Sequence, residues 1–278
     1  MSRFRPKRAL GQNFLVDRGI RDRILEALAV EEGDTVLEIG PGSGALTGGL
    51  ARKVGRAGAR LVLVELDDDL AEGWVRTFAD DPRVEVLHRD ILDVAMEEIA
   101  PGPRGLTVIG NIPYNITTPI LFHLLERPRP REIILMVQRE VADRILAPAG
   151  GGSYGALSVG VRSVADVEAV LPVPASAFRP RPKVDSTVIR LRPHDPSRLD
   201  EIEEARLRDL TRALFQWRRK QLRKILRDHP ALGLDAVEIE EVLLAGGARR
   251  TDRPETVDPR GFVAMARAMP VRGHSDPP

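Results

Sequence analysis

A glycine cluster in the first third of the chain has the spacing of a ligand-binding loop. Val36-Leu-Glu-Ile-Gly-Pro-Gly-Ser-Gly44 places glycines at 40, 42 and 44, directly after a predicted strand and before a predicted helix. Glycines at such a junction let the backbone approach a ligand closely, and the start of the helix offers unpaired N–H groups. A tight strand–helix turn without a ligand has the same composition, so the cluster alone leaves both interpretations open.

Two acidic residues come at the ends of the next two predicted strands. Glu65 ends the strand predicted at 60–65, where a carboxylate can accept both hydroxyls of a ribose. Asp90 follows the strand predicted at 84–87 and can accept a hydrogen bond from an adenine amine. Ligands of open α/β sheets bind at the carboxyl ends of the strands, where the glycine cluster also lies. Each acid alone suits a solvated loop, but together these features predict an adenosine-containing cofactor.

A fourth motif, Asn111-Ile-Pro-Tyr114, follows the strand predicted at 106–110. With the glycine cluster, Glu65 and Asp90, it resembles the S-adenosylmethionine-dependent methyltransferases that modify the exocyclic amine of adenine. Leu10-Gly-Gln-Asn-Phe-Leu15 and Phe178-Arg-Pro-Arg-Pro-Lys-Val-Asp-Ser186 look like the rRNA adenine dimethyltransferase family. Phe215-Gln-Trp-Arg-Arg-Lys-Gln-Leu-Arg223 is most similar to its members that act on the small ribosomal subunit. The resemblance covers roughly residues 7–270.

The resemblance implies a cofactor, a substrate and a set of site residues. The cofactor is S-adenosyl-L-methionine, and the substrate is a pair of adjacent adenosines in the hairpin loop near the 3′ end of 16S rRNA, each dimethylated. No metal is implied. The residues expected to bind the cofactor are Asn13, Leu15, Gly40, Gly42, Glu65, Asp90 and Asn111.

The chemistry expected of such a site rests on two hydrogen-bond acceptors. The lone pair of an adenine amine is delocalised into the ring, so it must be localised and aligned with the methyl group. The side-chain oxygen of Asn111 and the carbonyl oxygen of Ile112, held by Pro113, would accept the two amine hydrogens. Tyr114 would stack on one face of the flipped-out base and Phe178 on the other, at ~1–3 kcal/mol per base. Proximity and orientation then supply most of the rate, without a catalytic base.

Charge is distributed unevenly along a chain whose net charge is only +1. Residues 31–102 carry sixteen acidic and seven basic residues, whereas residues 179–227 carry fifteen basic and seven acidic ones. Four further basic residues lie within residues 1–8. This pattern indicates a small-molecule region beside a polyanion-binding surface, although a solvated helix face accounts for the basic run equally well. The residues expected to bind RNA, on one predicted helix, are Arg218, Arg219, Lys220 and Arg223.

The elements that must position these residues alternate between strand and helix. Strands are predicted at 35–39, 60–65, 84–87, 106–110 and 132–137, and helices at 17–29, 45–54, 67–78, 116–126 and 138–146. Strands at 157–161, 167–170 and 184–191 would complete the sheet. The pattern predicts an α/β fold, a mostly parallel Rossmann-like sheet with helices on both faces.

The pattern changes at Arg192-Pro-His-Asp-Pro196, beyond which only helices are predicted, at 197–214, 217–228, 235–245 and 259–268. We therefore expect a catalytic methyltransferase domain over 1–191, with a basic N-terminal arm, and a helical RNA- or ribosome-binding domain over 192–278. The chain has no cysteine, so thiolate metal sites and disulfides are excluded. Without an apolar run long enough to cross a bilayer or an export signal, we expect a cytoplasmic monomer.

Three other functions compete with this prediction. A 23S rRNA adenine dimethyltransferase conferring macrolide resistance shares the core motifs, and only the Phe215–Arg223 motif argues against it. A second alternative is a non-enzymatic factor that assists assembly of the small subunit, a role that could coexist with catalysis in the same protein. An NAD-dependent oxidoreductase is disfavoured, because its loop prefers Gly-x-Gly-x-x-Gly and because Asn111-Ile-Pro-Tyr114 has no place in it.

Overall fold

The computed structural model describes residues 12–100, 102 and 105–270, and the chain divides into two compact units. The first unit comprises residues 1–142 and 166–193, and the second comprises residues 143–165 and 194–278. No feature of the sequence indicated that residues 143–165 join the second unit. The division of function between 1–191 and 192–278 stays a prediction. The basic arm at residues 1–8 lies outside the described residues.

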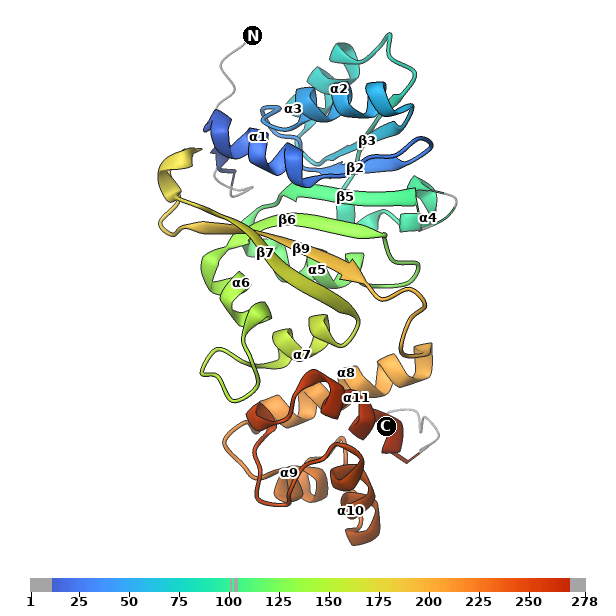
Figure 1. Ribbon diagram of the computed structural model, residues 1–278, viewed down its shortest axis with the longest axis vertical. Helices are drawn as coiled ribbons and strands as arrows, with labels where there is room; N and C mark the ends of the chain where they lie inside the picture. Colours follow the sequence, from blue (N-terminus) through green and yellow to red (C-terminus); the bar gives the residue numbers. More distant parts are fainter. Residues whose placement is uncertain (1–11, 101, 103–104, 271–278) are drawn as a thin grey trace. The chain divides into compact units, whose positions relative to one another are not determined.

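The first unit is built on a seven-stranded sheet in the order β4-β3-β2-β5-β6-β9-β7 (Figure 1). The pairings among the first five strands are parallel, and β9 runs antiparallel to β6. The strand order reverses between β2 and β5, which creates the switch point where ligands of such sheets bind. The bounds are Val84–His88 (β4), Arg60–Glu65 (β3), Thr35–Ile39 (β2), Leu106–Asn111 (β5), Glu132–Gln138 (β6), Ser186–Pro193 (β9) and Ala165–Val173 (β7).

The central strands are almost continuously apolar because both faces of the sheet are covered. Every residue of β2 is buried, including Glu38, and every residue of β3 except Arg60. The α/β fold predicted from the sequence is confirmed. The helices of this part of the chain are α1 (Arg18–Ala27), α2 (Thr47–Ala57), α3 (Asp68–Thr77), α4 (Met96–Ile99), α5 (Thr117–Leu124) and α6 (Arg139–Leu146).

Two very short strands, which the sequence did not predict, join motifs far apart in the chain. β1 (Phe14–Leu15) pairs antiparallel with β8 (Phe178–Arg179), with Leu15 opposite Phe178. The Val16 N–H extends the pairing by donating to the Ala177 carbonyl at 2.8 Å. The described part of the Leu10–Leu15 motif is thereby fixed to the start of the Phe178–Ser186 motif.

The second unit is helical, and the sequence prediction is wrong there at two places. The segment 157–161, predicted as a strand, lies in α7 (Ala156–Arg162). Its apolar residues are buried on nearly all sides, and such a run looks the same for a buried strand and a buried helix. Hydrogen bonding reveals the helix start, where the Gly155 N–H donates to Ser158 Oγ at 3.1 Å. The other helices are α8 (Glu201–Gln216), α9 (Leu222–Asp228), α10 (Ala236–Ala245) and α11 (Pro259–Ala268).

The predicted helix at 217–228 is also wrong at its start. Trp217–Lys220 form a turn, closed by the Lys220 N–H donating to the Trp217 carbonyl at 2.7 Å, and α9 begins only at Leu222. Arg218, Arg219 and Lys220 therefore lie in this turn, and only Arg223 of the four expected RNA-binding residues lies on the helix.

Candidate cofactor and catalytic site

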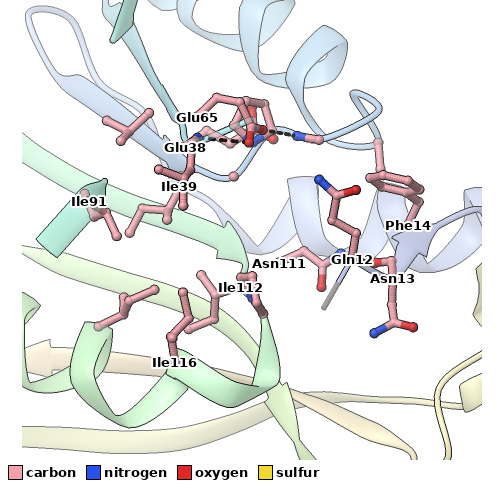
Figure 2. Close-up of a pocket in the computed structure, with 18 of the residues that line it drawn as sticks. Gln12, Asn13, Phe14, Glu38, Ile39, Glu65, Ile91, Asn111, Ile112 and Ile116 are labelled. Carbon is pink, nitrogen blue, oxygen red and sulfur yellow. Dashed lines mark hydrogen bonds between the residues drawn. The ribbon is translucent and has the colours of Figure 1, made fainter. Parts of the chain in front are cut away.

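A cavity of about 230 Å³ opens at the carboxyl ends of β2, β3 and β5 in the first unit (Figure 2). Its lining combines the glycine loop, the N-terminal motif and the segment after β5. It thus brings together residues that the sequence separates by almost a hundred positions. The sequence-predicted residues that line it are Asn13, Leu15, Gly40, Gly42, Glu65, Asp90, Asn111, Ile112, Pro113 and Tyr114.

The glycine loop is held between two aromatic side chains that the sequence analysis did not single out. Trp74 Nε1 donates to the Gly42 carbonyl at 3.2 Å. Gly44 has φ +86°, and a Cβ there would lie 2.5 Å from Trp74 Cη2, while one at Gly42 would lie 3.0 Å from Phe14 Cε1. Glycine at 42 and 44 is therefore required both by the backbone conformation and by the close approach of these rings.

Glu65, at the end of β3, supports the glycine loop from behind and already accepts several hydrogen bonds. Its Oε2 accepts from the Gly42 N–H at 2.9 Å, and its Oε1 accepts from the N–H groups of Leu66 and Asp67, each at 3.0 Å. Burial raises the pKa of Glu65, and these three bonds oppose the rise. A carboxylate offers about four acceptor positions, so Glu65 retains capacity for a ligand hydroxyl while it shapes the loop.

Glu38 is a second carboxyl group on this cavity, and sequence reasoning assigned it no role of its own. It lies on β2 and is only 2% exposed. Burial raises its pKa to about 8, the Thr47 hydroxyl opposes the rise and the charge of Glu65 adds to it. Its Oε2 accepts no hydrogen bond from any described residue. Figure 2 shows Glu38 beside Glu65, so a cationic ligand here would meet two carboxyl groups.

Asn111 is oriented by the N-terminal motif. Its Nδ2 donates to the Asn13 carbonyl at 3.0 Å, which directs the amide nitrogen toward that segment (Figure 2). The amide oxygen is left to accept a hydrogen bond from a ligand. Ile112, whose side chain is buried, and Pro113 continue the wall of the cavity.

Tyr114 also links two motifs. Its hydroxyl lies 2.7 Å from Ser186 Oγ, the last residue of the Phe178–Ser186 motif, and burial raises its pKa. Phe178 itself does not reach the cavity. It is fully buried in the hydrophobic core with Leu15 and Ala177, and it does not line the site. The expected stacking of Phe178 on a base is therefore not what the structure shows, because the β1–β8 pairing holds this residue in the core.

Asp90 lies at the mouth of the site after β4. Its Oδ1 accepts from the Leu92 N–H at 3.0 Å and caps the short helical turn Ile91–Asp93. Its second oxygen has no hydrogen bond to a described residue. The carboxylate is therefore fixed in direction and can still accept one from a ligand.

Three of the four basic residues expected to bind RNA, Arg218, Arg219 and Lys220, line a hollow of about 510 Å³ in the second unit. Trp217 lines it as well, whereas Arg223 does not. Arg218 donates to the Gly152 carbonyl at 3.1 Å and lies 3.8 Å from Glu255. Within the described residues, Arg219, Lys220 and Arg223 form no ion pair and are exposed. The structure therefore leaves three cations free to contact a polyanion.

The described part of the chain offers neither a metal site nor a membrane span. It holds no group of three or more His, Cys, Asp or Glu side chains arranged to bind a metal ion. No helix there is both long and apolar enough to cross a membrane.

Comparison with known proteins identifies the family. Residues 3–243 match the family model described as ribosomal RNA adenine dimethylase. The chain belongs to this family. This dimethylase is 41% identical over 263 residues to "Ribosomal RNA small subunit methyltransferase A" of Pseudomonas putida, covering 94% of each chain. It is 40% identical over 272 residues to the protein of the same name from Geobacter metallireducens, covering 97% of each.

Solved structures show the same fold over the same length. The dimethylase superposes on a dimethyladenosine transferase from Plasmodium falciparum with a TM-score of 0.73 and 26% identity, covering 91% of this chain and 95% of that one. It superposes on the 23S rRNA methyltransferase ErmE with a TM-score of 0.70 and 26% identity, covering 92% and 99%. The Rossmann-like methyltransferase sheet with a helical C-terminal part is thereby confirmed, and so is the enzyme class.

Proposed function

We propose that this dimethylase transfers methyl groups from S-adenosyl-L-methionine to the exocyclic amines of two adjacent adenosines in the 3′-terminal hairpin loop of 16S rRNA, as a cytoplasmic monomer and as a step in small-subunit biogenesis. The observation that carries the proposal is the cavity, which Asn111 lines together with the glycine loop, Glu65 and Asp90. The small-subunit assignment is supported by the relatives of that name, at about 40% identity over nearly the whole chain.

The lining residues fit the proposed cofactor. S-adenosylmethionine, when bound, supplies a methyl group on a positively charged sulfur. Glu65 has an acceptor position left for a ribose hydroxyl, and Asp90 has a free oxygen for the adenine amine. The unpartnered Oε2 of Glu38 adds a carboxyl group that a cation would stabilise in its ionised form. Asn13 and Leu15 would close the site from the N-terminal motif.

The protein's part in the reaction is to make an amide-like nitrogen nucleophilic. The Asn111 amide oxygen accepts one hydrogen of the target amine, and the Ile112 carbonyl accepts the other. The nitrogen lone pair would then leave the ring conjugation. A bound cofactor would supply the methyl group and keep the bonding electron pair as a neutral thioether, and the methylated nitrogen would lose one proton to solvent. Tyr114 offers its ring to one face of the base, and its bond to Ser186 fixes the ring plane. Holding the two reacting atoms in line supplies most of the rate.

The experiment that tests the function is tritiated methyl transfer to unmodified small subunits, with large subunits and protein-free 16S rRNA as parallel substrates. We expect incorporation into small subunits, mapped by nuclease digestion to two adjacent adenosines. Incorporation into large subunits alone would instead support the 23S rRNA activity for which ErmE is named. Isothermal titration with S-adenosylhomocysteine against NAD tests the cofactor, and NAD binding alone would refute it.

A further inference from the structure

A second basic hollow lies in the helical unit, apart from the turn that carries Arg218, Arg219 and Lys220. It has a volume of about 340 Å³, and four arginines line it with no acidic residue among them. We call it the arginine hollow. Its lining residues are Arg162, Ser163, Arg198, Pro259, Arg260, Val263, Ala264 and Arg267.

Helix α11 supplies one wall of the arginine hollow because of its residue spacing. Positions 260, 263, 264 and 267 follow the i, i+3, i+4, i+7 pattern and therefore share one face of the helix. The opposite face, with Phe262 and Met265, is fully buried. Two arginines one heptad apart thus flank a short apolar floor.

The remaining arginines come from two other segments: a hydrogen bond joins the backbone of Arg198 to α11, and another joins Arg162 to Ala147. Arg267 donates to the backbone carbonyl of Arg198, and its Nε donates to Glu203 Oε1 at 2.9 Å. Arg162, at the end of α7, donates to the Ala147 carbonyl at 2.7 Å. These bonds fix the side chains of Arg162 and Arg267 and the backbone at Arg198.

Two of the four guanidinium groups have no partner. Arg198 and Arg260 are exposed and form neither an ion pair nor a side-chain hydrogen bond with any residue that the structure describes. Some other arginines of the unit are paired, Arg227 with Asp228, Arg249 with Asp252 and Arg250 with Glu240, while others such as Arg208 and Arg212 are not paired with any described residue. Arg267 is paired with Glu203, and the three other positive charges around the hollow repel one another, so a bound anion would relieve that repulsion.

A buried hydroxyl in the lining points to the same ligand. Ser163 is only 4% exposed, and its Oγ has no hydrogen-bond partner among the described residues. A buried hydroxyl without a partner is costly unless a ligand supplies one. Arginine forks and a hydroxyl donor are the groups that bind phosphate oxygens.

We infer that the arginine hollow binds a backbone phosphate of the ribosomal RNA. No aromatic side chain lines it, so it offers nothing on which a base could stack, in contrast to the hollow beside Trp217. The inference rests on the proposed function for its RNA ligand, and it adds a contact separate from the Arg218–Lys220 turn.

The test compares two double variants of the full-length protein. R198Q/R260Q removes the two unpaired charges of the hollow. R208Q/R212Q is the matched control, because both residues are exposed on α8, have no ion pair with a described residue and change the net charge equally. Binding to unmodified small subunits is measured by filter assay at several salt concentrations, with titration of S-adenosylhomocysteine to check the cofactor site.

We expect R198Q/R260Q to bind about tenfold more weakly, since hydrogen bonds to charged groups contribute ~1.5–3 kcal/mol. Losing one phosphate contact should also flatten the plot of log K against log salt by about 0.7–0.9. The control should keep the wild-type slope, and both variants should keep the cofactor affinity. Ser163→Ala should weaken RNA binding without lowering the free energy of unfolding, because the hydroxyl it removes has no partner in the protein.

If R198Q/R260Q keeps the wild-type slope and affinity, or changes no more than R208Q/R212Q does, the inference is wrong. Failure of the wild type to bind small subunits would instead refute the proposed substrate. In that event the same variants are compared on large subunits and on protein-free 16S rRNA, and the hollow is judged on whichever RNA the wild type retains. If the wild type binds none of these RNAs, both the proposed function and the inference are wrong.

Discussion

Asn111 is the residue at which the cofactor site and the proposed chemistry meet. Its amide nitrogen is already bonded to the Asn13 carbonyl, so its orientation is set before any substrate arrives. A group fixed in this way does not have to reorganise as the amine reacts, which is the property that makes polar groups effective in catalysis. The N-terminal motif therefore orients Asn111, and in the proposed reaction it would contribute to methyl transfer in this way.

We expect Asn111→Ala to lower the single-turnover rate of methyl transfer by on the order of 100-fold, the usual cost of removing one preorganised polar group. RNA affinity should change much less, because Asn111 acts on the reacting amine. The rate is measured with S-adenosylmethionine saturating, so that a lost cofactor contact does not obscure the result. A rate within threefold of wild type would exclude Asn111 from the mechanism.

Glu38 makes stability depend on pH. Its pKa is about 8 in the folded protein, against an ordinary value of 4.5. Between these values the unfolded chain loses the proton while the folded protein keeps it, so the free energy of unfolding falls as pH rises through this window and levels off above it. Glu38→Gln removes the effect and retains the shape of the side chain.

We therefore expect the stability of the Glu38→Gln variant relative to wild type to increase from pH 5 to pH 8, by at most about 1.4 kcal/mol per pH unit. Urea denaturation of both proteins across this range measures it. Glu65, whose pKa is also raised, is present in both, so its own contribution largely cancels. A difference that does not vary with pH would show that Glu38 titrates normally.

At the scale of elements, the conformation of the glycine loop depends on Trp74 of helix α3, which lies outside the motif. Gly44 and Gly33 both have positive φ, +86° and +80°, but a Cβ at Gly33 would meet nothing within 4 Å. Gly33→Ala should therefore cost only the ~1–2 kcal/mol of backbone strain. Gly44→Ala should cost more and should also weaken S-adenosylmethionine binding, because it pushes Trp74 away from the loop. Equal losses in urea denaturation and calorimetry would show that Trp74 does not hold the loop.

Two variants can separate the hydrogen bond of Tyr114 to Ser186 from the proposed stacking of its ring on the base. Tyr114→Phe keeps the ring and loses the bond, so we expect methyl transfer to fall by only a few-fold and stability by about 1 kcal/mol. Tyr114→Ala removes the stacking surface as well, and transfer should fall by about 10- to 100-fold. A double-mutant cycle with Ser186→Ala should show that Tyr114→Phe has no further effect on stability once Ser186 is gone. Full activity of Tyr114→Ala would argue against stacking.

Hydrophobic periodicity predicted the strands and helices correctly where the apolar pattern was long. The strands at 35–39 and 60–65 and the helix capped by Asp17 were predicted correctly. The β1–β8 pairing was not predicted, because two-residue strands carry no periodicity. Since this pairing holds Phe178 in the core, missing it led to the wrong prediction that Phe178 stacks on the base. A motif shows that residues belong together, but not which of them face the cavity.

At the scale of the whole molecule, the sequence located the first unit's site better than the second unit's surfaces. The glycine loop, Glu65, Asp90 and Asn111 follow strands of one parallel sheet, and topology brings them to one edge. Nothing comparable constrains the charged side chains of a helical unit. The arginine hollow is assembled from three segments, and no spacing in the sequence indicates that Arg162 and Arg260 line the same hollow.

The turn that carries Arg218, Arg219 and Lys220 is the other surface of the second unit that we expect to contact RNA. Changing Arg219, Lys220 and Arg223 together to Gln should weaken binding to small subunits and flatten the salt dependence by roughly 2–3 units of slope, if each residue contacts one phosphate. Arg218 is left unchanged, because it supports the fold through Gly152 and Glu255. Cofactor affinity, measured by calorimetry, should not change. An unaltered slope would show that the turn is a solvated surface.

The placement of the two tryptophans gives the protein a built-in optical signal for each of its ligands. The chain has only Trp74 and Trp217, one in each compact unit. The indole of Trp74 is hydrogen-bonded to the glycine loop, so we expect its emission to change when the cofactor cavity is filled. Trp217 lines the basic hollow with Arg218 and Lys220, so its quenching follows RNA. The Trp217→Phe variant leaves Trp74 as the single indole for timing cofactor binding, whereas Trp74→Phe, which also removes the hydrogen bond to Gly42, serves only for timing RNA binding at Trp217.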